Sequence, residues 1–179
     1  MELKTPRLFL RKFHLEDLAG LIEEANNLNI LKFLHPIPYP VTEEFTREWL
    51  RKCEGEYEKS PQTVYPFAIE LSNEGKLIGG IELREVSRYS ENATIGYWLG
   101  ENHWKNGYAS EAVEKVVDFG VKDLNLVRIN AEVDVQNTCS SRLLEKLGFV
   151  HEGRKEKFVR VISTGELADY DLYGWVVRD

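Results

Sequence analysis

The chain has 179 residues, of which 42% are hydrophobic and 30% are charged, and its formal net charge is −7. This size and composition are typical of one globular domain with a core of ordinary size, so we expect a single domain over residues 1–179. The acidic balance argues against a nucleic-acid partner, and no apolar run is long enough to span a bilayer. The first residues form no apolar signal region, so we expect a cytoplasmic protein without a membrane partner.

The cysteines and histidines indicate neither a disulfide framework nor a metal site. Cys53 and Cys139 are the two cysteines, a number that fits a reducing compartment, and we expect Cys139 to be a small buried residue. The four histidines have no partners at metal-ligand spacing, so we expect no bound metal.

The first third of the chain reads as one strand and two helices. Residues 7–13 alternate as in a strand, and residues 15–26 carry an apolar stripe at helical spacing. The proline-rich segment 31–41 cannot form a regular helix. Thr42 is placed to cap the next helix, which we expect to run to about residue 58.

The rest of the chain alternates strands and helices. We predict strands at 64–71, 76–86, 92–99, 127–135, 150–162 and 166–177, and helices at 108–124 and 138–147. Turns are expected at 73–75 and 163–165. The resulting order, β-α-α-β-β-β-α-β-α-β-β, predicts an α/β fold with a mixed sheet.

The stretch IGYWLGENHWKNGYASEA (95–112) carries the strongest chemical signal. A strand that runs through a glycine-bearing turn into a helix exposes free N–H groups beside the positive end of the helix dipole. Such a terminus binds phosphate, and Gly107 lets the backbone approach the anion closely. The stretch is neither a Walker A loop nor a dinucleotide fingerprint, and similar turns also occur without a ligand.

A second stretch, VRINAEVDVQNTCSSRLLEKLGFVHEG (127–153), narrows the interpretation. Together the two stretches resemble the GNAT superfamily of N-acetyltransferases, and most closely its ribosomal-protein N-terminal acetyltransferase branch (the RimJ/RimL type). The family loop Q/R-x-x-G-x-G/A, with Trp often first in this branch, corresponds here to residues 104–109. The opening TPRLFLRKFHLEDL and the closing STGELADYDLYGW also look like this branch, so the resemblance covers nearly the whole chain.

The resemblance implies a GNAT-type fold. The expected sheet is mixed and mostly antiparallel, with about seven strands flanked by about four helices. In the family, the strands that correspond to 92–99 and 127–135 splay apart, and the pantetheine arm of the coenzyme lies between them.

The resemblance also implies acetyl-CoA as co-substrate. The residues expected to bind it are Leu99, Gly100, Trp104, Lys105, Asn106, Gly107, Tyr108, Ala109, Ser110 and Asn137. The loop N–H groups would hold the diphosphate, and main-chain groups at Leu99 and Gly100 would bind the pantetheine amides and the thioester carbonyl. Lys105 would add charge or remain a solvated lysine, and His103 is expected to be solvated. Asn137 should cap the following helix and also reach the coenzyme arm.

The catalytic residues are less sharply defined. Glu132 lies five residues before Asn137, where some GNAT enzymes keep a catalytic glutamate, although a solvent-facing role fits its strand equally well. Glu82 is a weaker candidate for the base. The tyrosine that many relatives place seven residues after the Asn is replaced here by Leu144. Ser140 could instead donate a hydrogen bond to the sulfur, or merely pack at the helix start, and Ser141 is a distant second.

Two segments are candidates for acceptor recognition: residues 29–39, with Phe33 and Tyr39, and the turn 163–165. A packed surface loop is an equally good interpretation of the first. Of Tyr97 and Trp98, one should face the core and the other the cleft.

The sequence therefore predicts an acetyl-CoA-dependent N-acetyltransferase acting on a primary amine. A protein N-terminal α-amine, attacking directly in a ternary complex, is favoured over a small amine, an amino acid or a polyamine, because of the branch resemblance. The alternatives from other classes are a non-catalytic acyl-CoA-binding module and an unrelated phosphate-binding domain. The sequence leaves room for a homodimer.

Overall fold

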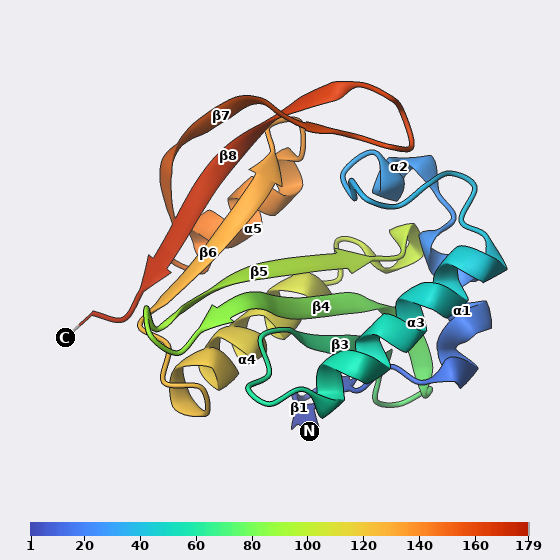
Figure 1. The fold of residues 1–179 in the computed structure, drawn as a ribbon, viewed down its shortest axis with the longest axis horizontal. Helices are drawn as coiled ribbons and strands as arrows, with labels where there is room; N and C mark the ends of the chain where they lie inside the picture. The colour runs from blue at the N-terminus through green and yellow to red at the C-terminus, as the bar shows by residue number, and fades with distance from the viewer. Residues whose placement is uncertain (179) are drawn as a thin grey trace.

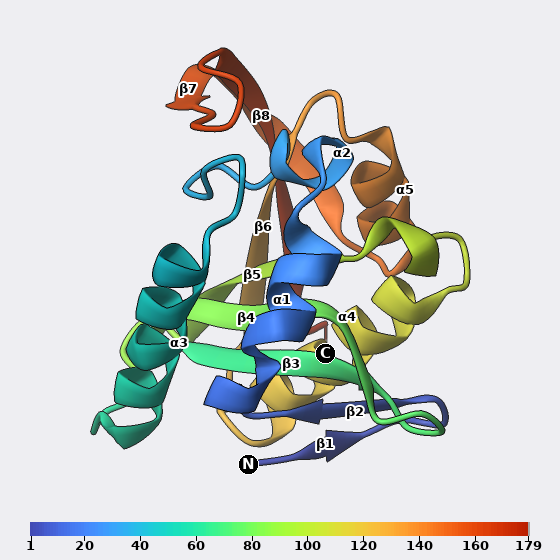
Figure 2. The same ribbon diagram turned by 90° about the vertical axis from the view of Figure 1, so that its right-hand side faces the viewer.

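A computed structural model describes residues 1–178 and shows one eight-stranded sheet with helices on both faces (Figures 1 and 2). The strands are β1 (Leu3–Lys4), β2 (Leu8–Arg11), β3 (Tyr65–Leu71), β4 (Lys76–Ser87), β5 (Asn92–Leu99), β6 (Arg128–Asp134), β7 (Val150–Arg160) and β8 (Leu167–Val176). The helices are α1 (Leu18–Ala25), α2 (Leu28–Leu31), α3 (Glu43–Glu58), α4 (Tyr108–Lys122) and α5 (Thr138–Lys146), with short 3-10 turns at Leu15–Asp17 and Glu101–His103.

The strand order is β1-β2-β3-β4-β5-β6-β8-β7, and every neighbouring pair is antiparallel except β5 and β6. The expected fold class is therefore confirmed. The structure adds β1, whose two residues are too few to show alternation, and α2, a single turn beside the proline-rich segment. Within residues 1–178, none of the helices has both the length and the apolar character needed to cross a bilayer.

The parallel pair β5–β6 separates partway along its length. Their pairing begins at Asn92 with Arg128 and ends at Ile95 with Ala131, although both strands continue. Beyond that point β5 stays paired with β4, whereas β6 follows β8 away from it (Figure 1). The splay expected from the family resemblance is thus present, and it opens the sheet at residues 96–99.

Two apolar layers hold the sheet between its helices. The larger cluster joins the central strands to α4 through residues such as Val113, Val116 and Phe119. The smaller one packs α1 and α3 against the opposite face through Leu21 and Leu50. Figure 2 shows α1 and α3 on one face and α4 and α5 on the other. Because both faces of the central strands are covered, the end of β5 lies between two helical layers.

Polar caps fix where the helices near the opening begin. The Thr42 hydroxyl accepts the N–H of Phe45 at 3.2 Å and starts α3. The Asn137 side chain accepts the N–H of Ser140 at 3.2 Å and starts α5 at the end of β6. Such caps contribute about 1 kcal/mol each. The predicted capping role of Asn137 is confirmed, and it places Ser140 in the first turn of α5 beside the opening.

Candidate active site

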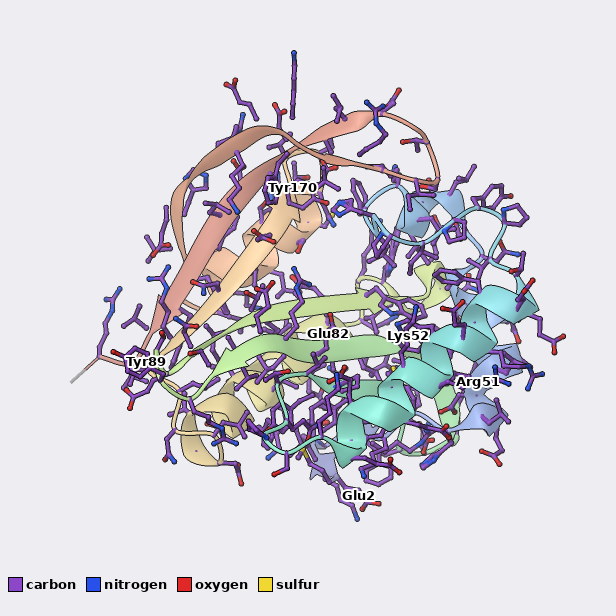
Figure 3. All side chains as sticks on the ribbon, in the orientation of Figure 1. Glu2, Arg51, Lys52, Glu82, Tyr89 and Tyr170 are labelled. Carbon is purple, nitrogen blue, oxygen red and sulfur yellow. The ribbon has the colours of Figure 1, made fainter. Side chains whose placement is uncertain are left out.

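A cavity of about 430 Å³ lies where β5 and β6 separate. Side chains from β4, β5 and β6 line it, together with α3, residues 33–37, β7 and β8. Figure 3 labels Glu82 on β4 and Tyr170 on β8, which line the cavity from two sides. Residues 33–37 belong to the segment expected to recognise the acceptor: Phe33 lines the cavity, whereas Tyr39 is exposed and does not.

Charged side chains form a chain across one wall of the cavity. Arg84 lies 3.6 Å from Glu82 and 3.4 Å from Glu132, and Lys155 on β7 contacts the other oxygen of Glu132 at 2.9 Å. Burial raises the pKa of Glu82 above its ordinary value, while Arg84 opposes the shift. Glu132 lines the cavity and forms ion pairs with two cations, Arg84 and Lys155, whereas Glu82 forms one with Arg84.

Gly96 on β5 makes room for this charged wall. A Cβ atom built on Gly96 would lie 3.0 Å from Nη1 of Arg84 and 3.7 Å from Oε1 of Glu82. A larger residue would force the Arg84 guanidinium to shift. The glycine thus lets both charged groups reach the point where the sheet opens.

Tyr97 and Trp98 both line the cavity but pack into different layers. Tyr97 lies against the α4 side of the sheet, and its hydroxyl is 2.7 Å from the Ser140 hydroxyl. Trp98 packs against the α1 and α3 layer, with its indole over Gly80. The two side chains lie on opposite faces of β5, but both have part of their surface in the cavity, so the prediction that one faces the core and the other the cleft was wrong.

The irregular segment after α1 is bound to the β7–β8 hairpin over the cavity. The Ser163 hydroxyl donates to the carbonyl of Leu31 at 3.0 Å, and the N–H of Ile162 donates to the carbonyl of His35 at 3.3 Å. Nδ1 of His35 is 3.2 Å from the Tyr170 hydroxyl. Burial lowers the pKa of His35, which keeps its imidazole neutral at physiological pH. The two segments proposed for acceptor recognition are therefore in direct contact.

The hydroxyl groups at the opening are those of Tyr97 and Ser140. Leu144, seven residues after Asn137, is fully buried in the main core. Ser141 is turned back on its own helix, where its hydroxyl is 3.5 Å from the carbonyl of Asn137. Of the serines at the start of α5, Ser140 is the one that lines the cavity.

The loop before α4 has the geometry of an anion site. Gly107, the N-cap, has φ +80°, and within the described chain no side chain caps this terminus. The first N–H groups of the helix, from Tyr108 to Ser110, therefore point out of the helix without intrahelical acceptors. Lys105 is exposed and also has a positive φ, +62°. Free N–H groups, a helix N-terminus and a glycine with no Cβ fit a diphosphate.

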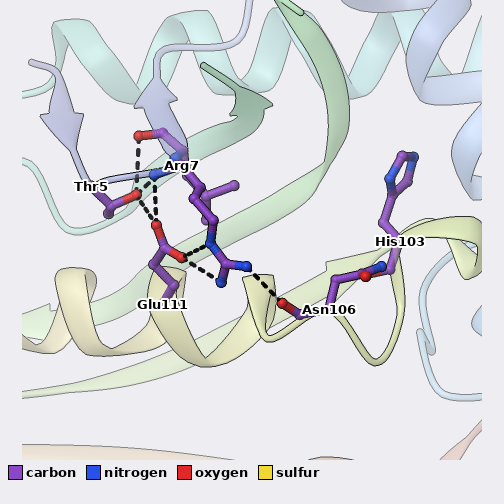
Figure 4. Close-up of polar contacts among 6 residues, drawn as sticks. Thr5, Arg7, His103, Asn106 and Glu111 are labelled. Carbon is purple, nitrogen blue, oxygen red and sulfur yellow. Dashed lines mark hydrogen bonds and ion pairs between the residues drawn. The ribbon is translucent and has the colours of Figure 1, made fainter. Parts of the chain in front are cut away.

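Arg7 organises this loop, and sequence patterns gave no indication of it. Its side chain contacts Glu111 in the first turn of α4 at 2.7 Å, and Nη1 donates to the carbonyl of Asn106 at 2.9 Å (Figure 4). The Thr5 hydroxyl also contacts Glu111, at 2.5 Å. Burial alone would raise the pKa of Glu111, but these hydrogen bonds outweigh it and lower that pKa. The contacts neutralise an acidic side chain beside the anion site.

The end of β5 differs in detail from the expectation. The N–H of Gly100 donates to the carbonyl of Ile78 at 2.9 Å, so it is not free to bind a carbonyl. The carbonyl of Leu99 accepts the Trp104 indole N–H at 2.8 Å, which anchors the loop to the strand. His103 is not solvated as expected: its ring is mostly buried, 3.3 Å from Glu24, and Figure 4 shows it turned away from Arg7.

Two further expectations concern cysteine and metal. Cys139 is exposed, so the prediction of a buried residue was wrong; the register of α5 turns Leu144 inward and leaves Cys139 outside. Among residues 1–178, no three His, Cys, Asp or Glu side chains come together in a group able to hold a metal ion.

The fold and this site define a class of enzyme, and comparison with known proteins identifies the family. The family described as "Acetyltransferase (GNAT) domain" matches residues 7–150. The uncharacterised N-acetyltransferase p20 of Bacillus licheniformis is 32% identical over 182 residues, covering 99% of this chain and 97% of that protein. A spermidine N(1)-acetyltransferase of Vibrio cholerae is 27% identical, covering 82% of this chain and 81% of that protein.

Among solved structures, the ribosomal-protein-S5-alanine acetyltransferase of Vibrio fischeri aligns with a TM-score of 0.84 and 22% identity, covering 100% of this chain and 98% of that one. At 22% identity, this structural similarity is evidence for the fold alone. This chain belongs to the GNAT acetyltransferase family. It is an N-acetyltransferase that uses acetyl-CoA. The comparisons include both ribosomal-protein and polyamine enzymes, so they do not single out the RimJ/RimL branch.

Proposed function

We propose that this enzyme acetylates the α-amino group of a protein N-terminus by direct attack of the neutral amine on acetyl-CoA in a ternary complex. The observation that carries the proposal is the position of the cavity. It meets the split between β5 and β6 at Tyr97, Asn137 and Ser140, and the loop at Gly107 begins beyond the end of the same strand. An acceptor entering the cavity and a coenzyme held by the loop would therefore meet at the split.

The charge of the cavity favours a cationic acceptor. Acidic side chains outnumber basic ones among its lining residues, which include Glu48, Glu82, Glu132, Asp134, Lys52 and Arg84. An α-amine has an ordinary pKa of about 8, compared with about 10.4 for a lysine side chain. The α-amine is thus partly neutral near pH 7, so one carboxylate is enough to take its remaining proton.

Glu82 is the carboxylate best suited to accept that proton. Its raised pKa makes it a better proton acceptor than an ordinary glutamate, and Arg84 is the one cation beside it. Glu132 was the first candidate from the sequence and stays a candidate. Its two oxygens are already engaged by Lys155 and Arg84, which favours a role in holding those cations.

The coenzyme side of the reaction is assigned to the loop and to α5. Residues 104–110 would hold the diphosphate through main-chain N–H groups, with Lys105 adding charge from solvent. Asn137 and the strand end at Leu99 would bind the pantetheine arm, and Ser140 would donate a hydrogen bond to the sulfur. Because the N–H of Gly100 is already used by Ile78, the oxyanion donor has to come from another main-chain group of the split strand.

A polyamine acceptor is the second candidate, favoured by the excess of acidic side chains around the cavity and by the spermidine acetyltransferase among the relatives. The deciding experiment offers four acceptors in equal amounts: a lysine-free peptide with a free N-terminus, the same peptide blocked at its N-terminus and carrying one lysine, spermidine, and a free amino acid. Release of the coenzyme thiol gives the rates, and mass spectrometry gives the product.

The proposal expects the free peptide to be acetylated fastest and at its α-amine. Preference for spermidine would replace the proposed acceptor with a polyamine. Tight binding of coenzyme A without turnover on any amine would indicate a non-catalytic module, and equally tight binding of nucleotides that lack pantetheine would indicate a general phosphate site.

A further inference from the structure

Tyr97 lies at the first part of β5 that is no longer paired with β6. The last paired position is Ile95, opposite Ala131, and β5 ends at Leu99. The ring of Tyr97 packs against the main core, and its hydroxyl is 2.7 Å from the Ser140 hydroxyl. The contact spans the gap between β5 and the first turn of α5, where both residues line the cavity.

The geometry of this contact allows either hydroxyl to donate, and here we consider the arrangement in which Tyr97 is the donor. Burial raises the pKa of Tyr97 to about 12, so its hydroxyl keeps its proton at physiological pH and is available to donate. The backbone N–H of Ser140 already donates to Asn137. When the Ser140 oxygen accepts this hydrogen bond, its own O–H is free to donate to another acceptor, and the Ser140 side chain lines the cavity.

Acyl transfer requires a donor at that point. The amine nitrogen forms a bond to the acetyl carbon, the carbon–sulfur bond breaks, and its electron pair stays on the sulfur. The surplus proton of the amine goes to Glu82, and the sulfur takes its proton from solvent as the thiol departs. Among the hydroxyls that line the cavity, that of Tyr170 is engaged with His35 on the far wall, which leaves the Tyr97–Ser140 pair at the split.

We propose that Tyr97 is a positioning residue for acyl transfer: its hydroxyl donates to Ser140 and thereby directs the Ser140 O–H onto the sulfur of coenzyme A. Tyr97 does not give up its proton. It fixes the rotamer of a serine that has little preference of its own, and the serine then stabilises the thiolate as it forms. This inference rests on the proposed function, because it takes the split between β5 and β6 as the place of the thioester.

The first test is a cycle of the variants Tyr97→Phe, Ser140→Ala and their combination. We expect each single change to lower kcat by about tenfold, the value of one hydrogen bond to a charged group, with the KM for acetyl-CoA within about twofold. If Tyr97 acts through Ser140, the double variant is no slower than Ser140→Ala alone. If the reductions in kcat of the two single variants multiply in the double variant, Tyr97 acts independently of Ser140 and the inference fails.

The second test needs no acceptor. The affinity of free coenzyme A is measured against pH, which reports the pKa of its thiol in the complex. A donor at the sulfur lowers that pKa, so it should be lower in the wild-type complex than in either single variant. An identical thiol pKa in all three proteins would reduce the contact to a structural link and overturn the inference.

Tyr65→Phe is the control, because Tyr65 also packs in the main core, where it is buried and Tyr97 is partly buried, and its hydroxyl contacts Arg88 outside the cavity. It should lower the unfolding temperature and leave both kcat and the thiol pKa unchanged. Failure to acetylate any amine would contradict the proposed acceptor while the thiol titration still decides the role of Tyr97. Failure to bind coenzyme A at all would overturn both.

Discussion

Arg7 and Glu111 are 104 residues apart in the sequence, and they form a two-oxygen contact that ties the chain before β2 to the first turn of α4. Nε of Arg7 donates to one carboxylate oxygen at 2.7 Å, and its backbone N–H donates to the other at 2.9 Å. The same guanidinium holds the carbonyl of Asn106, one residue before the glycine of the loop. A side chain outside the loop therefore fixes the conformation of the proposed diphosphate site.

Replacing Arg7 by Met should raise the KM for acetyl-CoA by about fivefold with little change in kcat, because one half-exposed ion pair and one backbone contact contribute about 1 kcal/mol. Steady-state kinetics at saturating acceptor measures both constants. Arg51→Met, an exposed arginine on α3 labelled in Figure 3, is the control and should leave the KM unchanged. An unaltered KM in the Arg7 variant would remove the residue from the account of coenzyme binding.

Gly107→Val should abolish coenzyme binding. A valine has to adopt φ +80° at considerable strain, and its branched side chain would occupy the space where a diphosphate approaches the N–H groups. Gly75→Val is the control, since Gly75 also has a positive φ, +63°, with open space around it in the β3–β4 turn. Calorimetric titration with coenzyme A should give ordinary affinity for the Gly75 variant and none for the Gly107 variant. Equal affinities would contradict the assignment of the loop.

Local patterns predicted the fold and the loop, whereas the contacts between distant segments had to come from the structure. Alternation and helical stripes are properties of a few neighbouring residues, and Gly107 and Asn137 stand at chain reversals with their own chemical signal. The partner of Tyr97 is 43 residues away and that of Arg7 is 104 residues away, so no window of sequence contains either pair. The inward face of α5 was also undecided locally, which is why Cys139 was misplaced.

Replacing Glu82 and Glu132 each by Gln shows which of the two carboxylates is the general base. Glu82→Gln should lower kcat by about a hundredfold, the ordinary effect of losing a general base. In the wild type, kcat/KM should rise with pH through the pKa of Glu82, because the ionised carboxylate is the form that accepts a proton. Burial raises that pKa above the ordinary 4.5. The corresponding rise of kcat/KM with pH should disappear in the Gln variant.

Glu132→Gln should have a smaller effect on kcat and keep the rise of kcat/KM with pH that Glu82 causes. Its main consequence should be a lower free energy of unfolding, because Arg84 and Lys155 lose a shared partner. If the rise of kcat/KM with pH disappears in the Glu132 variant and remains in the Glu82 variant, Glu132 is the general base and Glu82 is not.

Acid should weaken the fold through Asp17. This buried carboxylate accepts two hydrogen bonds from Arg11, at 2.8 Å each, and one from the N–H of His14. Burial acts to raise the pKa of Asp17, but these contacts outweigh it and lower the pKa below the ordinary 3.8. A depressed folded-state pKa stabilises the protein above the unfolded value, and that stabilisation is lost as the pH falls from 3.8 through the folded pKa.

Asp17→Asn should therefore lower the free energy of unfolding at pH 7 by about 2 kcal/mol and flatten its dependence on pH below the ordinary aspartate value. Urea unfolding at a series of pH values measures both effects. An unchanged acid slope in the variant would show that other carboxylates account for it.

The Ser163 hydroxyl links the β7–β8 hairpin to the segment after α1 over the proposed acceptor cavity. Ser163→Ala removes the hydroxyl that donates to the carbonyl of Leu31 and so weakens the link between the hairpin and the segment after α1, which keeps the contacts of His35 with Ile162 and Tyr170. One hydrogen bond contributes about 1 kcal/mol, so the KM for the acceptor should rise by about fivefold while the KM for acetyl-CoA stays constant. Thr164→Ala is the control, because its hydroxyl contacts only the N–H of Glu166 within the hairpin. If both variants behave alike, or if the KM for acetyl-CoA changes instead, the contact between these two segments does not shape the acceptor site.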